Sequence, residues 1–128
     1  NLDMLEEAAS AARLQKISRM DPKALSARDV LEMATIGGAR VLGLDDKIGT
    51  LEAGKRADVI VIDLRDIKSQ PVYAAESAIV YAASGSAVTT TICDGKFLMR
   101  DRKVLTVDVP ATLEKAREYR DKVRASLQ

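Results

Sequence analysis

The Asp94-Gly95 pair is the feature that most constrains how this chain can fold. It separates two runs rich in β-branched and apolar residues, 88–93 and 96–99. Both central positions of a type I′ turn have positive φ, which Asp and Gly tolerate, so the pair predicts an antiparallel hairpin. A second turn at residues 101–102 would lead into another short strand and complete a small meander.

A first helix is predicted near the start of the chain. Asn1 suits the N-cap position, and the acidic residues that follow suit the first turn, where the helix dipole favours negative charge. Apolar residues recur at helical spacing until Asp21-Pro22 breaks the pattern. The sequence therefore predicts a helix that ends near Arg19.

A second helix is predicted from Ser26 onward. Ser26 and Asp29 have the spacing of a capping box in which Asp replaces the usual Glu. The apolar stripe that follows ends at Gly43, a residue type typical of helix C-termini. Gly37 and Gly38 inside the stripe weaken a helix, so we expect them to pack closely against a neighbouring element. The stripe consists of Leu31, Ala34, Thr35, Ala39 and Leu42.

From residue 48 the pattern changes to strands and turns. Residues 48–51 predict a short strand, and residues 52–55 predict a turn. Val59–Ile62 is a continuous β-branched run, which predicts a strand buried on both faces. We expect a loop over residues 65–73 and a short helix over residues 74–83, closed by a Ser-Gly-Ser turn.

A last helix is predicted from Pro110, a residue type that suits the first helical position. Its apolar residues keep a helical rhythm that Arg120 interrupts, so we expect this helix to pack on the surface. Its basic residues predict a cationic face, favoured near a helix C-terminus, more than a site for an acidic partner. These residues are Arg117, Arg120, Lys122 and Arg124.

The composition is that of one soluble globular domain, with 128 residues, 47% apolar and 30% charged. Twenty basic and nineteen acidic residues give a net charge of +1, and aromatic residues are few, which argues against nucleic-acid binding. No apolar run approaches the roughly 20 residues that span a bilayer. Cys93 is the only cysteine, so we expect no intrachain disulfide, a cytoplasmic location and a small apolar filler role for Cys93 in a strand.

The absence of histidine limits the chemistry that this chain can carry. Mechanisms based on Ser-His-Asp or Cys-His, and zinc sites of the usual His or Cys type, are excluded. The carboxylates are scattered among lysines and arginines, so caps and solvated faces explain them better than a magnesium or calcium site. The stretch 49–55 ends in Gly-Lys but lacks phosphate-loop spacing, and Asp45-Asp46 fits a polar loop better than a cation site.

Two adjoining segments carry a family resemblance. Ala34–Leu44 (ATIGGARVLGL) and Ile48–Leu64 (IGTLEAGKRADVIVIDL) resemble the C-terminal signature of the amidohydrolase superfamily. In that signature a helix precedes a Gly-x-Leu-x-x-Gly-x-x-Ala-Asp turn and a buried strand. Its length and fixed gaps make it specific to the superfamily, and many branches share it.

Further stretches resemble one branch, the 5-methylthioadenosine/S-adenosylhomocysteine deaminases and triazine hydrolases. They are Asn1–Glu7 with Leu14-Gln15-Lys16, Val80–Val88, and Ile92–Lys96 with Met99. The resemblance covers nearly the whole chain.

The resemblance implies that no catalytic, substrate-binding or metal-binding residue lies in this chain. In the family a divalent metal is held by a His-x-His pair, two further histidines and an aspartate, all upstream of residue 1. Asp3 lies a few positions beyond that aspartate, so we interpret it as a helix-terminal acid and not as a ligand. Asn1 matches the tail of a polar segment that lines the family's substrate pocket, without itself being assigned a contact.

The fold class that the resemblance implies is α/β. Residues 1–46 would be outer helices that close a (β/α)₈ barrel. Residues 47–109, with the hairpin at 88–99, would form most of a small composite β-sandwich domain that N-terminal strands of the enzyme complete. Residues 110–128 would be a C-terminal helix laid across the surface.

The implied function is that of a C-terminal fragment of a metal-dependent hydrolytic deaminase of S-adenosylhomocysteine or 5-methylthioadenosine. The intact enzyme would use zinc or iron to activate water, act on a purine nucleoside-like small molecule and form a homo-oligomer. This chain alone would bind no metal and be inactive. The alternatives are a guanine deaminase, a triazine hydrolase, or a free-standing β-sandwich interaction module. Because the chain opens into a helical pattern without an initiator Met, we expect that it was cut from something longer.

Overall fold

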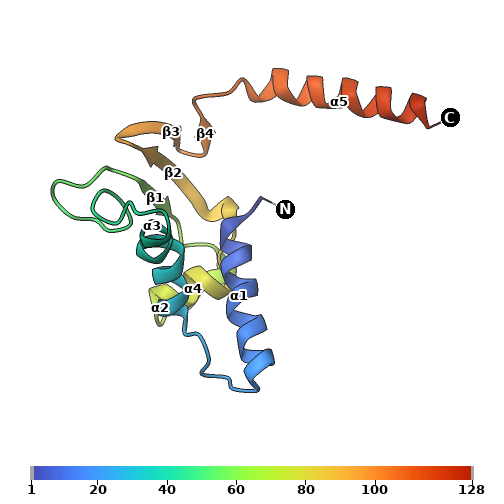
Figure 1. Ribbon diagram of the computed structural model, residues 1–128. Helices are drawn as coiled ribbons and strands as arrows, with labels where there is room; N and C mark the ends of the chain where they lie inside the picture. Colours follow the sequence, from blue (N-terminus) through green and yellow to red (C-terminus); the bar gives the residue numbers. More distant parts are fainter. Residues whose placement is uncertain (1, 128) are drawn as a thin grey trace.

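A computed structural model describes residues 2–127, in which α1 to α4 lie together beside one small antiparallel sheet and a last helix extends away from it (Figure 1). The mixed helix and strand content agrees with the predicted α/β class. The main elements are α1 (Met4–Arg19), α2 (Ala27–Glu32), α3 (Gly38–Val41), β1 (Val59–Ile62), α4 (Ala75–Tyr81), β2 (Val88–Cys93), β3 (Lys96–Arg100), β4 (Lys103–Val104) and α5 (Val109–Ser126).

Helix α1 ends where the sequence predicts, at Arg19, and the next residue, Met20, adopts a left-handed conformation with φ of 50°. Its N-cap differs from the prediction. The carboxylate of Asp3 caps the helix by accepting hydrogen bonds from the first-turn backbone. Asn1, to which we assigned this role, lies outside the described residues.

Helix α2 begins with the predicted capping box. The backbone N–H of Asp29 donates to the Ser26 hydroxyl at 3.2 Å, and the N–H of Ser26 donates to the Asp29 carboxylate at 2.9 Å. The helix then widens into a π-helical turn, Met33–Gly37, before α3. A π turn is a local change in backbone spacing that the apolar stripe does not reveal.

The expectation that Gly37 and Gly38 pack against a neighbouring element is wrong. A Cβ atom at Gly37 would approach only the Glu32 backbone, 3.1 Å from its carbonyl oxygen, which belongs to the preceding turn of the same helix. At Gly38 a Cβ atom would meet only the carbonyl oxygen of Met33, at 3.5 Å. Gly37 therefore relieves crowding inside the π turn, whereas the contact at Gly38 is an ordinary van der Waals distance.

The close approach between elements occurs at Gly49 instead. A Cβ atom there would lie 2.8 Å from the Cα atom of Ile36 and 2.9 Å from the Cβ atom of Ala39, and Gly49 has φ of +94°. This left-handed, tightly packed backbone breaks any extended run, so residues 48–51 form no strand, contrary to the prediction. The predicted turn at 52–55 is present, closed by a 3.2 Å hydrogen bond from Lys55 N–H to the Glu52 carbonyl.

The sheet has the order β1-β2-β3-β4 with antiparallel neighbours, which confirms the predicted meander. Asp94 and Gly95 at the β2–β3 turn have φ of 49° and 75°, as a type I′ turn requires. In β1, Ile60 and Val61 expose 50% and 49% of their surface, so this strand is not buried on both faces as predicted. Cys93, expected as apolar filler, is exposed at the end of β2.

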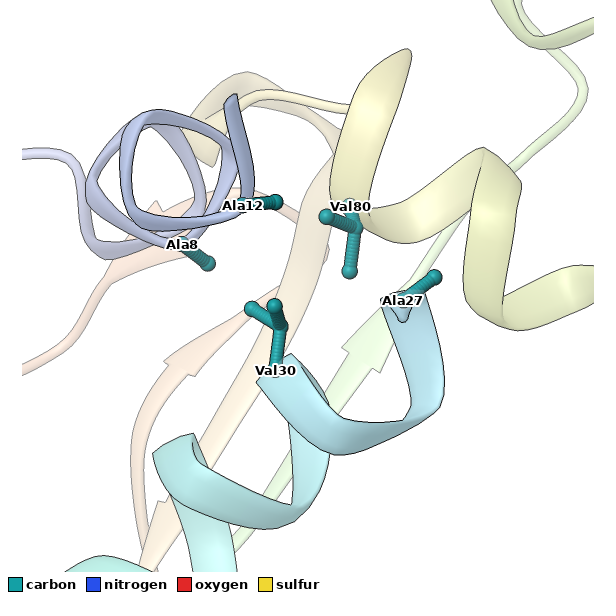
Figure 2. Close-up of a cluster of buried hydrophobic side chains, with 5 residues drawn as sticks. All are labelled: Ala8, Ala12, Ala27, Val30 and Val80. Atoms are coloured by element: carbon teal, nitrogen blue, oxygen red, sulfur yellow. The ribbon is translucent and has the colours of Figure 1, made fainter. Parts of the chain in front are cut away.

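The main hydrophobic core joins α1, α2 and α4 (Figure 2). Helix α4 lies within the predicted range 74–83, and its Val80 points between the other two helices. Most core side chains are alanines and valines, which let the three helices approach closely. The cluster consists of Ala8, Ala12, Ala27, Val30 and Val80.

Helix α5 extends away from the rest of the chain (Figure 1) and buries none of its described residues. It begins at Val109, where Asp108 accepts a 3.1 Å hydrogen bond from Ala111 N–H, so Pro110 is the second helical residue and not the first. The expectation that this helix packs across the surface is therefore wrong. Among the described residues, no helix is both long and apolar enough to cross a membrane.

Candidate functional site

A cluster of charged side chains lies just after β1. The carboxylate of Asp63 accepts two hydrogen bonds from the Arg65 guanidinium, at 2.9 Å from Nε and 2.8 Å from Nη2, and a third from the Arg65 backbone at 3.0 Å. Arg102, in the turn between β3 and β4, places its Nη2 atom 3.7 Å from the same carboxylate. The Asp63 side chain is only 16% exposed, so the two arginines compensate a largely covered charge.

The ionisation of this cluster follows from these contacts. Hydrogen bonds from the Arg65 side chain and backbone hold the pKa of the Asp63 carboxyl far below its ordinary value of 3.8. The same contact raises the pKa of the Arg65 guanidinium. Because the carboxylate stays ionised and the guanidinium stays protonated near neutral pH, neither group suits general acid–base catalysis.

An open hollow of about 420 Å³ lies over this cluster. Two serine hydroxyls at its rim, Ser84 and Ser86, lie 2.9 Å apart and pair with each other, and Arg102 Nε donates to the Ser86 carbonyl at 3.3 Å. The hollow therefore contains charged and hydroxyl groups, and its two serine hydroxyls pair with each other. Its polar lining includes Asp63, Arg65, Lys68, Ser84, Ser86 and Arg102.

A second polar contact lies at the start of α1. The backbone N–H of Gly85 donates a 2.6 Å hydrogen bond to Oδ2 of Asp3. This bond, followed by those of the first helical turn, lowers the pKa of the Asp3 carboxyl below its ordinary value. Asp3 is thus a helix-terminal acid, as interpreted from the sequence, but one with a partner 82 positions away.

Other residues weighed from the sequence have structural surroundings. The carbonyl of Asp45 accepts a 2.7 Å hydrogen bond from Lys55, which places Asp45-Asp46 in a loop tied to the following turn. On α5, Arg120 pairs with the neighbouring Asp121 at 2.8 Å on an exposed face. Within residues 2–127, no three His, Cys, Asp or Glu side chains lie together in a way that fits a metal ion.

The sequence reasoning missed both the Asp63 cluster and the partner of Asp3. The Asp63-Leu64-Arg65 spacing is a local signal for the contact between Asp63 and Arg65. In a loop, the side chain of an Asp can accept a hydrogen bond from the backbone N–H two residues later. No local signal predicts the parts played by Arg102 and Gly85, since both come from distant segments.

Comparison with known proteins identifies the protein family. The amidohydrolase family matches residues 1–98, and the chain belongs to that family.

Two curated relatives narrow the likeness within the family. The chain is 48% identical over 119 residues to the 5'-deoxyadenosine deaminase of Methanobrevibacter smithii, a match that covers 92% of this chain and 27% of the relative. It is 50% identical over 116 residues to the 5-methylthioadenosine/S-adenosylhomocysteine deaminase of Desulforudis audaxviator, covering 91% and 27% respectively. The chain thus spans about a quarter of the length of these relatives.

Solved structures of similar proteins agree with these sequence matches. An adenosine deaminase of Xanthomonas campestris with bound zinc superposes with a TM-score of 0.91 at 38% identity, covering 95% of this chain and 28% of the other. The atrazine chlorohydrolase of Arthrobacter aurescens superposes with a TM-score of 0.75 at 26% identity, covering 87% and 25%. The resemblance to the thioether-adenosine deaminase and triazine hydrolase branch is confirmed.

Proposed function

We propose that this chain is the C-terminal part of a hydrolytic deaminase that acts on S-adenosylhomocysteine or 5-methylthioadenosine. The reaction replaces the adenine amino group with oxygen from water and releases ammonia. The observation that carries the proposal is the 50% identity, over nearly the whole chain, to a deaminase named for these two substrates.

The chain contributes scaffold to this enzyme. Its residues do not fit a divalent metal, because it has no histidine and residues 2–127 contain no group of three possible ligands. We therefore derive no step through a metal from this chain, and we assign the zinc or iron of the proposed enzyme to ligands outside it. The zinc bound by the Xanthomonas campestris relative supports a metal-dependent enzyme.

The assignment of three segments of the chain to structural units of the enzyme is also a proposal. We assign residues 1–46 to helices that close the barrel, residues 47–109 to the small β domain and residues 110–128 to a terminal helix. The sheet lies within the second range, which supports this division, whereas α4 also lies in that range and packs against α1 and α2 of the first. The cytoplasmic location and the homo-oligomeric state of the enzyme stay predictions.

A substrate panel tests the proposal. The longer protein that contains this chain, purified with its metal, should convert S-adenosylhomocysteine or 5-methylthioadenosine to the inosine analogue, with a change in ultraviolet absorbance. 5'-Deoxyadenosine belongs in the panel because one relative is named for it. Turnover of guanine or a triazine, without activity on either thioether, would assign the protein to another branch. A protein that turns over none of these compounds would sink the deaminase assignment and leave the family assignment standing.

A further inference from the structure

The Asp3 carboxylate joins two segments that are 82 positions apart in the chain. Its Oδ1 atom caps α1 by accepting hydrogen bonds from Leu5 N–H at 3.0 Å and Glu6 N–H at 3.3 Å. Its Oδ2 atom accepts the 2.6 Å hydrogen bond from Gly85 N–H. Each carboxylate oxygen thus has a separate structural task, one local and one tertiary.

The turn that receives this carboxylate fits closely against it because residue 85 is glycine. A Cβ atom at Gly85 would lie 3.0 Å from Oδ2 and 3.2 Å from Cγ of Asp3. Such contacts are tighter than ordinary van der Waals packing, so a side chain there would displace the carboxylate. The glycine and the aspartate therefore fit each other as a pair.

The receiving turn is itself anchored to the sheet. The carbonyl of Ala87 accepts a 2.8 Å hydrogen bond from Asp63 N–H, at the end of β1. The carbonyl of Ser86 accepts the 3.3 Å hydrogen bond from Arg102, in the β3–β4 turn. Through Gly85, the first turn of α1 is thus connected to the sheet as well as to the helical core.

We infer that Asp3 is a positioning residue for the active site of the proposed deaminase. Because its carboxylate fixes the start of α1 against an anchored turn, the chain that leads into α1 is held in one orientation. The inference rests on the proposed function, in which α1 is a helix that closes the barrel, because the active sites of (β/α)₈ barrels are built from the loops that lead from the strands into such helices. A small displacement of reacting groups is enough to lower the rate of a positioned reaction.

Two variants of the longer protein test the contact between Asp3 and Gly85, one at each residue. Asp3→Ser keeps a good N-cap for α1 but is too short to reach Gly85 as well. Gly85→Ala keeps the N–H donor and places a methyl group against the carboxylate. Each should lower kcat about tenfold or more and change KM less than about threefold. The double variant should be no slower than the worse single variant, because both remove one contact.

Asp108→Ser is the matched control, because Asp108 also caps a long helix but has only local partners on α5. It should keep kcat within about twofold of the parent value. Wild-type kcat in Asp3→Ser and Gly85→Ala, or losses that add in the double variant, would overturn the inference. If Asp3→Ser does not fold, the kcat and KM of Gly85→Ala still test the inference.

Hydrogen exchange separates this inference from the proposed function. Protection of the Gly85 amide should fall in Asp3→Ser and stay unchanged in Asp108→Ser. If the parent protein deaminates no adenosine thioether, the proposed function fails and so does the catalytic part of the inference, while loss of protection still establishes the contact. Unchanged protection in Asp3→Ser would overturn the inference whatever the substrate.

Discussion

The backbone N–H of Asp94 donates a 2.6 Å hydrogen bond to the carboxylate of Asp58, so the β2–β3 turn is held by the residue that immediately precedes β1. The next N–H along, that of Gly95, donates to the Ala57 carbonyl at 3.1 Å. Ala57 and Asp58 are the last two residues of the turn signature by which the family resemblance was recognised. In this chain that signature therefore has a structural role, which is to support the hairpin.

Removal of this acceptor should destabilise the chain. Asp58→Ala should lower the free energy of unfolding by about 1 kcal/mol, because the Asp94 N–H loses its partner. Asp58→Asn, which keeps an acceptor oxygen, should lose less. Urea unfolding of both variants is the measurement, with Asp46→Ala in the nearby exposed loop as control. Equal midpoints for Asp58→Ala and Asp46→Ala would contradict this role.

The turn itself depends on Gly95, whose φ of 75° a β-branched residue resists. Gly95→Val should destabilise the chain by roughly 1 kcal/mol or more. Gly95→Asn should cost less, because Asn tolerates the left-handed conformation. Thermal unfolding compares the two, and a melting temperature that Gly95→Val leaves unchanged would show that the turn does not need this backbone geometry.

Stability should fall in acid because three carboxyls, those of Asp3, Asp29 and Asp63, have pKa values lowered by their hydrogen bonds. A lowered folded-state pKa contributes stability above the unfolded value of about 4, and this contribution is lost as the pH falls toward the folded value. In urea titrations below pH 4, Asp63→Asn should lose less stability than the parent chain. Parallel pH profiles for the two proteins would mean that the Arg65 contact does not survive in solution.

Features set by neighbours in sequence were predicted well. The Ser26–Asp29 capping box and the Asp94-Gly95 turn each depend on a few adjacent backbone groups, so the local pattern is sufficient to identify them. Residues 48–51 show the limit of that reasoning. Their β-branched and apolar composition favours a strand, but the approach of Gly49 to Ile36 imposes a left-handed backbone that only the tertiary structure reveals.

Burial was predicted less well for the same reason. A β-branched run such as Val59–Ile62 indicates a strand with two covered faces, and Ile60 and Val61 are nevertheless half exposed. What covers a strand depends on distant parts of the protein. The site follows the same rule, because the local pattern identified Asp3 as a helix-terminal acid and only the folded chain brings it to Gly85.

The exposed edge of the sheet should make the isolated chain associate with itself. Strand β1 pairs only with β2 in the described sheet, and such edges recruit other chains. Light scattering at rising concentration should give a mass above that of a monomer. Val61→Lys on β1 should reduce this association. Leu14→Lys, on the exposed side of α1, is the control for general apolar contact.

If Leu14→Lys reduces the association and Val61→Lys does not, helix surfaces and not the strand edge are responsible. A parent chain that stays monomeric at high concentration would count against the need for missing strands to complete the β domain.

The most direct test of the account compares the 128-residue chain with the longer protein that contains it, in one absorbance assay. Both are loaded with the same divalent metal and given S-adenosylhomocysteine or 5-methylthioadenosine. We expect loss of the adenine amino group with the longer protein and no change with the isolated chain. Deamination by the isolated chain, or none by the longer protein, would contradict this expectation.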